Sequence, residues 1–139
     1  MQMDRDALTE FLKAEFQQVA DMFAIDQVRA DGIRVRLLHH ERHLRPGGTV
    51  SGPAMFALAD VAVYLAILAQ VGPKALSVTT NCAIDFMRKP AAGVDLICEA
   101  RILKLGRALA VGDCLLYSAG QTAPVARASL TYSIPSERG

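Results

Sequence analysis

Hydrophobic and polar positions repeat with two different periods along the chain, and each period predicts a kind of element. Between about residues 4 and 19, apolar residues recur every three or four positions, which is the spacing of one face of a helix. These residues are Leu8, Phe11, Leu12, Phe16 and Val19. Asp4 or Thr9 can cap this helix at its start.

Two short runs of strand-forming residues follow, at 25–30 and 33–38. They are joined at Asp31-Gly32, and Asp-Gly between two such runs favours a hairpin. The next segment, 39–51, carries Pro46, Gly47 and Gly48 at its centre and has the composition of a loop. We therefore expect a hairpin and then a loop before the next regular element.

From about 52 to 71 the chain is almost entirely apolar and rich in Ala and Leu, which favour a helix. Pro53 suits its first turn, and Gly72-Pro73 suits its end. The length is marginal for a membrane span, but Asp60 lies near the middle and basic flanks are lacking. The pattern therefore favours a central helix buried in the protein, and no membrane partner.

Period-two alternation returns in four segments, at 77–87, 94–105, 107–117 and 124–134. In the first of these, simple alternation puts Thr79 and Asn81 on the same face. The connections between the segments are short, and short connections imply antiparallel neighbours. We predict an α+β fold in which a curved antiparallel sheet of about six strands lies around one long central helix, as a single domain over 1–139.

Composition and charge narrow the possible partners. The 139 residues are 52% hydrophobic and 21% charged, which excludes a disordered chain. The formal net charge is +1, aromatic residues make up 6% and Trp is absent, so nucleic acid is not an expected partner. A small chain with such an apolar excess is expected to bury surface against copies of itself.

Other residue types give weaker indications. Cys82, Cys98 and Cys114 lie in apolar stretches without a CxxC pair, which is typical of buried thiols in a reducing compartment. The charged N-terminal segment lacks the apolar region of a secretory signal, so we expect a cytoplasmic protein. The three histidines between 39 and 43 do not form HExxH, and we expect a polar turn there and no metal site.

Asp60 is the only charged residue between Gly52 and Gly72. Burying an unpaired carboxylate is costly, so Asp60 needs a compensating role. One interpretation places it at an exposed edge of the helix or beside a structural Arg or hydroxyl. The other makes it a general base or a nucleophile in an apolar cleft. The residues alone leave both open.

The start of the same helix is a second candidate for chemistry. A glycine-containing loop, 48–53, leads into a helix N-terminus, where free N–H groups can stabilise an oxyanion. The simpler interpretation is a cap by Ser51 or Gly52 with Pro53 in the first turn, and the local pattern favours it.

Gly52 and Asp60 are eight residues apart, which is about 12 Å along a helix. One carbonyl carbon cannot contact both within one chain. If both serve one reaction, they must come from two copies whose helices run antiparallel about a two-fold axis. The spacing therefore predicts a symmetric dimer with two composite sites.

The run from Gly48 to Pro53, Ala59-Asp60, the segment from Thr79 to Pro90, and 104–107 together resemble a known family, the hotdog-fold acyl-CoA thioesterases. The similarity is greatest to the phenylacetate-degradation (PaaI-like) branch of the 4-hydroxybenzoyl-CoA thioesterase superfamily and covers roughly 30–134. The resemblance implies the hotdog fold, with homodimers that pair into homotetramers. It also implies a substrate that contains coenzyme A, and no separate cofactor.

The family's usual loop reads Asn-x-x-Gly-x-x-His-Gly-Gly and is followed by an acid in the central helix. Asp60 matches the acid, and Gly48 and Gly52 match two of the glycines. The family's Asn falls on Arg45, its His on Ser51 and its last Gly on Pro53. Ser51 therefore supplies only a hydroxyl where the family orients the thioester with an imidazole.

The resemblance also implies roles. Asp60 would activate water or attack the thioester carbonyl, the Gly52 N–H would stabilise the oxyanion, and Thr79 would help to place the water. Asn81 would be the neighbour of Thr79 on the same face. Four cations are candidates to contact the phosphates of CoA, although an ordinary solvated edge explains each of them singly. They are Arg88, Lys89, Lys104 and Arg107.

The function predicted from the sequence is an acyl-CoA thioesterase acting on a small, medium-chain or aryl acyl group. Two alternatives remain. A non-catalytic acyl-CoA binding or regulatory protein is compatible with Ser51 and Pro53. An enoyl thioester hydratase or dehydratase needs a His beside the acid, and none lies between Ser51 and Gly72.

Overall fold

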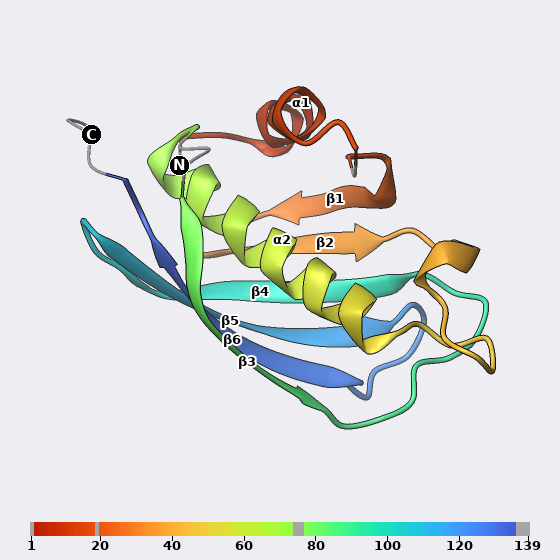
Figure 1. Cartoon of the computed structure of the whole chain (residues 1–139). Helices are drawn as coiled ribbons and strands as arrows, with labels where there is room; N and C mark the ends of the chain where they lie inside the picture. Colours follow the sequence, from red (N-terminus) through yellow and green to blue (C-terminus); the bar gives the residue numbers. More distant parts are fainter. Residues whose placement is uncertain (1, 19, 74–76, 136–139) are drawn as a thin grey trace.

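Six antiparallel strands form one sheet, and a long helix lies across its concave face (Figure 1). The structure is a computed structural model that describes residues 2–18, 20–73 and 77–135. The spatial order is β1-β2-β4-β5-β6-β3. The strands are β1 (Phe23–Val28), β2 (Gly32–Leu37), β3 (Val78–Phe86), β4 (Leu96–Leu105), β5 (Leu109–Ser118) and β6 (Ala126–Ser133). The predicted α+β architecture is confirmed.

The first helix, α1 (Arg5–Glu15), begins where the sequence predicts it, because the Asp4 side chain accepts a hydrogen bond of 2.9 Å from the Ala7 N–H. It ends earlier than the predicted residue 19. Phe16 has left the helical conformation, with φ −132°, and its ring packs edge-on against Tyr64 at 5.6 Å. Residue 19 itself lies outside the described residues.

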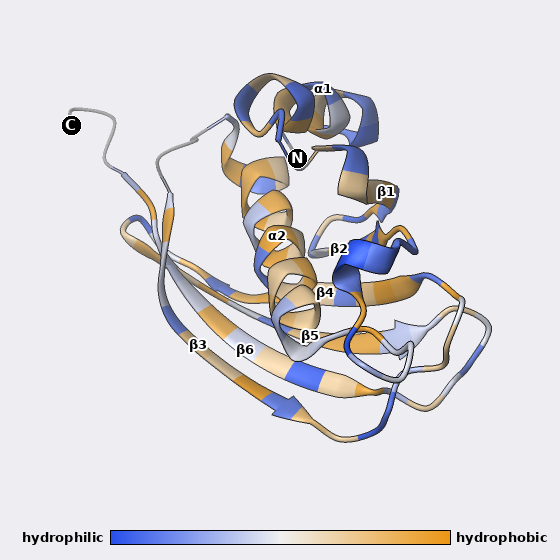
Figure 2. Cartoon of the chain, turned by 45° about the vertical axis from the view of Figure 1, so that its right-hand side comes forward, coloured by the Kyte–Doolittle hydropathy of each residue, from blue (hydrophilic) through white to orange (hydrophobic). Residues whose placement is uncertain are grey.

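The central helix, α2 (Gly52–Val71), has the predicted bounds. Ser51 caps its start, Pro53 lies in the first turn, and Gly72 ends it with a φ of +90°. The helix is long and apolar enough to cross a membrane, but 67% of its most apolar window is buried inside the protein. Figure 2 shows it as mostly hydrophobic along its length. It is the buried core helix that the pattern favours.

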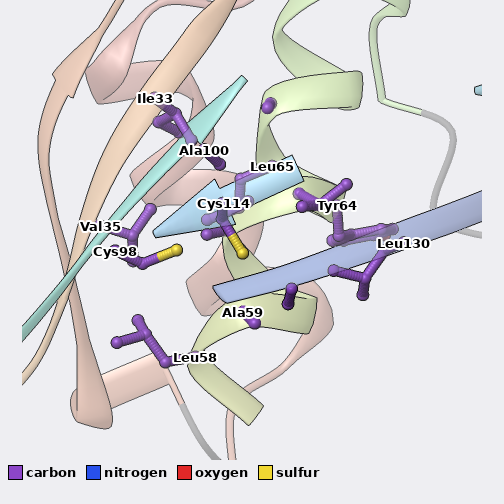
Figure 3. Close-up of a cluster of buried hydrophobic side chains, with 14 of the residues drawn as sticks. Ile33, Val35, Leu58, Ala59, Tyr64, Leu65, Cys98, Ala100, Cys114 and Leu130 are labelled. Atoms are coloured by element: carbon purple, nitrogen blue, oxygen red, sulfur yellow. The ribbon is translucent and has the colours of Figure 1, made fainter. Parts of the chain in front are cut away.

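The core fills the space between α2 and the sheet. Figure 3 shows Leu58, Ala59 and Leu65 of α2 facing side chains from the strands. Cys98 and Cys114 are free, buried thiols within this cluster, whereas Cys82 is only partly buried. Burial raises the pKa of the Cys98 thiol, which therefore stays protonated and behaves as a small apolar group.

Strands β1 and β2 form the hairpin predicted at Asp31-Gly32. Strand β1 lies two residues earlier than the predicted 25–30. Strand β2 lies one residue earlier than the predicted 33–38, so Gly32 itself is its first residue. A Cβ atom at Gly32 would lie 2.4 Å from the backbone oxygen of Ala100 on β4. Glycine is therefore required here by the close approach of two strands.

Strand β3 carries an irregularity that the alternating pattern does not reveal. Thr79 pairs with Tyr132 of β6, but Asn81 pairs with the next residue of β6, Thr131, so the ladder skips Thr80 as a β-bulge does. The bulge reverses the alternation. Thr79 faces α2, whereas Asn81 faces away, so the prediction that they share a face is wrong.

Strand β3 is also an edge of the sheet. It pairs with β6 on one side, and on the other side no described strand pairs with it. Val78 and Phe86, at its two ends, are 56% and 53% exposed. A nine-residue edge of this kind can pair with another chain.

Candidate active site

Asp60 lies near the middle of α2, partly exposed, above the start of β3 and the end of β6. The Thr79 hydroxyl donates a hydrogen bond of 2.6 Å to Asp60 Oδ1. The Tyr132 hydroxyl lies within hydrogen-bond distance of the same Oδ1 and 2.6 Å from the backbone oxygen of Asp60. No Lys or Arg among the described residues forms an ion pair with this carboxylate. Of the side chains that the structure describes, two hydroxyl groups hold the Asp60 carboxylate.

Sequence reasoning missed Tyr132. The residue is 2% exposed, and burial followed by the Asp60 charge raises the pKa of its hydroxyl, so Tyr132 remains a protonated donor. Its ring packs at a centroid distance of 6.0 Å from Tyr64, one helical turn beyond Asp60. The alternation of β6 indicates a buried face for position 132, but only the register of β3 on β6 brings it beside Thr79.

The N-terminus of α2 leaves one backbone donor for a ligand. The Ser51 hydroxyl accepts from the Ala54 N–H at 3.3 Å, and the Ser51 backbone oxygen accepts from the Met55 N–H at 3.1 Å. Pro53 has no N–H. Within the described chain, the Gly52 N–H is then the first-turn donor without a partner. The cap by Ser51 is confirmed, and it uses one acceptor lone pair of that hydroxyl.

A cavity of about 550 Å³ opens beside this helix end. It brings together four predicted site residues, Arg45, Gly52, Arg88 and Lys89. Thr49 adds a polar group to the lining. The remaining lining is apolar and consists of Pro46, Val50, Met55, Phe86, Met87 and Pro90. The cavity therefore combines an apolar wall with cations, as a ligand with an anionic and an apolar part requires.

The other predicted residues lie elsewhere. Gly48 is a loop position with a φ of +84°, which favours glycine, and Pro53 is exposed in the first turn of α2. Lys104 and Arg107 lie where β4 turns into β5, which is the opposite end of the sheet from the cavity (Figure 1). Within one chain, the structure does not bring these two cations to Arg88 and Lys89.

His43 is the most buried of the three clustered histidines, at 5% exposure. Burial, and then the positive charge of Arg42 and the neighbouring His40, lower its pKa, while the Leu38 carbonyl opposes the shift. The described residues contain no group of three His, Cys, Asp or Glu side chains that could hold a metal ion.

Comparisons with known proteins identify the family of the chain. The family model described as "Thioesterase superfamily" matches residues 47–125. An esterase-named protein of Pseudomonas aeruginosa is 32% identical over 101 residues, which are 73% of this chain and 74% of that protein.

Solved structures give the same result. The crystal structure of a thioesterase-named protein of Silicibacter sp. TM1040 has a TM-score of 0.90 and 59% identity, and the match covers 96% of this chain and 92% of that chain. A variant of the phenylacetic acid degradation protein PaaI of Thermus thermophilus has a TM-score of 0.73 and 25% identity, over 86% of this chain and 99% of that chain. The chain thus belongs to the thioesterase superfamily, and it is a thioester hydrolase.

Proposed function

We propose that the protein hydrolyses acyl-CoA thioesters to a free acid and coenzyme A, with Asp60 as the catalytic base. One observation carries this proposal: a lone carboxylate in an apolar helix is held by two hydroxyls, from Thr79 and Tyr132, and by no cation among the described residues. A carboxylate that no cation neutralises is free to accept a proton.

The attacking water binds to Asp60 Oδ2, to which no described residue donates a hydrogen bond. A water on Oδ2 transfers a proton to Asp60 while its oxygen bonds to the thioester carbon. The carbonyl electron pair moves onto oxygen, where the Gly52 N–H stabilises it. Collapse of this intermediate breaks the C–S bond, and the departing sulfur takes the proton from Asp60. Direct attack by Asp60 is the alternative, in which its carboxylate displaces the CoA thiolate and forms a mixed anhydride. After a single turnover in ¹⁸O-labelled water, label in the protein would show this route, with the anhydride opened at the Asp60 carboxyl carbon.

The proposal needs two copies of the chain. Gly52 and Asp60 lie eight residues apart on α2, about 12 Å along the axis. The exposed edge of β3 lies beside Asp60 and offers a surface for a second copy. We propose a homodimer about a two-fold axis, with dimers pairing into a homotetramer, in which Gly52 of one copy serves Asp60 of the other.

The same two-fold arrangement gives a role to the separated cations. Because the copies run antiparallel, Lys104 and Arg107 of one copy approach the cavity end of the other, where Arg88 and Lys89 lie. We propose that these groups, with Arg45, bind the phosphates of CoA. The apolar cavity wall suits a small, medium-chain or aryl acyl group. We further propose that the enzyme is cytoplasmic and belongs to the phenylacetate-degradation branch of its superfamily.

Steady-state kinetics on a panel of acyl-CoA thioesters tests the proposal, with aryl and straight-chain members of increasing length. Asp60→Asn keeps the size of the side chain and is expected to lower kcat by about a hundred-fold or more, because the amide cannot act as a base. Full activity of Asp60→Asn would exclude the proposed base. Tight binding of CoA without turnover by the wild type would favour a non-catalytic binding protein instead.

A further inference from the structure

We propose that Tyr132 is a positioning residue of this site, whose hydroxyl, together with that of Thr79, fixes Oδ1 of Asp60 so that Oδ2 alone faces the reacting water. This inference rests on the proposed role of Asp60 as base. It concerns a residue that touches the base rather than the substrate.

Two donors converge on one oxygen atom. The Thr79 and Tyr132 hydroxyls both reach Asp60 Oδ1, and no described residue donates to Oδ2. An unrestrained aspartate can rotate and exchange its two oxygen atoms, which would move the bound water. Two hydroxyls on one oxygen remove that freedom, and positioning of this kind contributes to rate.

Tyr132 is well suited to hold Asp60 in place. Its hydroxyl also lies 2.6 Å from the backbone oxygen of Asp60, so its single proton is shared between side chain and backbone of the same residue. The ring is 2% exposed and packs against Tyr64, which limits its own movement. The Tyr132 hydroxyl thereby holds the carboxylate in a fixed position relative to the backbone of α2.

The β-bulge in β3 is part of this arrangement. Thr79 and Tyr132 are direct partners across β3 and β6, which puts both hydroxyls on the α2 face. Beyond the skipped Thr80, the alternation continues with Cys82 toward α2, where burial, and then the Asp60 charge, raise the pKa of the thiol. Without the bulge, Thr79 would face away from α2, like Asn81.

Tyr132→Phe tests the inference because it removes one oxygen and keeps the ring. We expect kcat to fall by about ten- to hundred-fold while KM changes by less than about two-fold, since the hydroxyl acts on the base and not on substrate binding. Tyr117→Phe is the matched control, because Tyr117 lies on β5 facing away from α2 and its kinetics should equal those of the wild type.

A double-mutant cycle with Asp60→Asn separates positioning from a general structural role. In the Asp60→Asn background the base is gone, so adding Tyr132→Phe is expected to change the residual rate by less than about two-fold. An equal loss in both backgrounds would overturn the inference. If Asp60→Asn is inactive and Tyr132→Phe has the wild-type kcat, the role of Tyr132 is wrong while that of Asp60 stands. If Asp60→Asn is fully active, the proposed function itself fails.

A second substitution avoids dependence on the folding of Tyr132→Phe. Site-specific fluorotyrosine at position 132 keeps both the ring and the hydroxyl but makes the phenol a stronger donor. A carboxylate that accepts a stronger hydrogen bond is a weaker base, and its position is unchanged here, so we expect kcat to fall by roughly two- to five-fold as fluorine atoms are added. In Tyr132→Phe the loss of positioning outweighs the opposite gain in basicity. A kcat that does not change along this series would contradict the proposal.

Discussion

His43 is a buried titratable group outside the proposed chemistry, and its lowered pKa makes stability depend on pH. The unfolded chain takes up the proton near the ordinary value of 6.5, whereas the folded chain takes it up only at lower pH. Below pH 6.5 the unfolded state therefore binds more protons. The free energy of unfolding contributed by this group falls as pH falls.

We expect His43→Leu to reduce the dependence of stability on pH between about 6.5 and 5, by at most about 1.4 kcal/mol per pH unit, the value for one proton. Urea denaturation at a series of pH values measures this slope. Above about pH 7.5, where His43 is neutral in both states, the variant should follow the wild-type slope. An unchanged slope in His43→Leu would show that His43 titrates alike in both states.

Single residues differ in how far their roles can be predicted. Asp60 is singled out as a candidate by its contrast with an apolar helix, which is a local signal. For Gly52 the local pattern favours a plain helix cap, and only the family resemblance implies a role as oxyanion donor. Tyr132 carries no such contrast, because a tyrosine in an alternating strand is ordinary. Its contact with Asp60 depends on the packing of α2 against β6, which joins residues 72 positions apart in sequence.

Elements show the same distinction. The bounds of α2 are predicted because glycine and proline mark both of its ends. The bulge in β3 lies among threonines and asparagine, all of which a regular strand accommodates, so nothing in the sequence marks the skipped residue. For this reason the prediction that Asn81 shares a face with Thr79 is wrong. Its role in binding substrate stays a prediction.

The contact of β2 with β4 depends on Gly32, beside the hairpin. A methyl group there would meet the Ala100 backbone oxygen at 2.4 Å, and a backbone atom cannot move aside as a flexible side chain can. We expect Gly32→Ala to lower the free energy of unfolding by about 1–3 kcal/mol, as measured by urea denaturation. In Gly52→Ala the nearest atom is a ring carbon of Phe86 at 3.4 Å, so stability should change little. Equal stability of both variants would contradict the close approach of the strands.

At the scale of the whole molecule, the proposed composite site predicts complementation between two inactive variants. Asp60→Asn lacks the base, and Gly52→Pro lacks the N–H donor at a position where helices tolerate proline. A dimer with one copy of each contains one intact site and one site with both changes. Random assembly of equal amounts should therefore restore about a quarter of the wild-type activity.

The measurement is specific activity after co-expression, or after joint unfolding and refolding, of the two variants. A mixture of Asp60→Asn with Asp60→Ala is the control, because none of its dimers contains an intact site. If the first mixture stays as inactive as the control, Gly52 and Asp60 do not act across an interface. The experiment does not require the natural substrate, since any acyl-CoA that the wild type hydrolyses can be used to measure the restored activity.

The position of Thr79 on the edge strand has a consequence for how the enzyme fails. Strand β3 is held by β6 on one side, and the bond from Thr79 to Asp60 ties its start to α2. Fraying of a strand begins at an edge with few neighbours. The first part of the sheet to come loose would thus carry away one of the two hydroxyls on the base, while the buried helix and the remaining five strands are still folded. Loss of catalysis would then precede loss of the fold. A second copy paired along β3 would hold this edge strand in place and so protect catalysis.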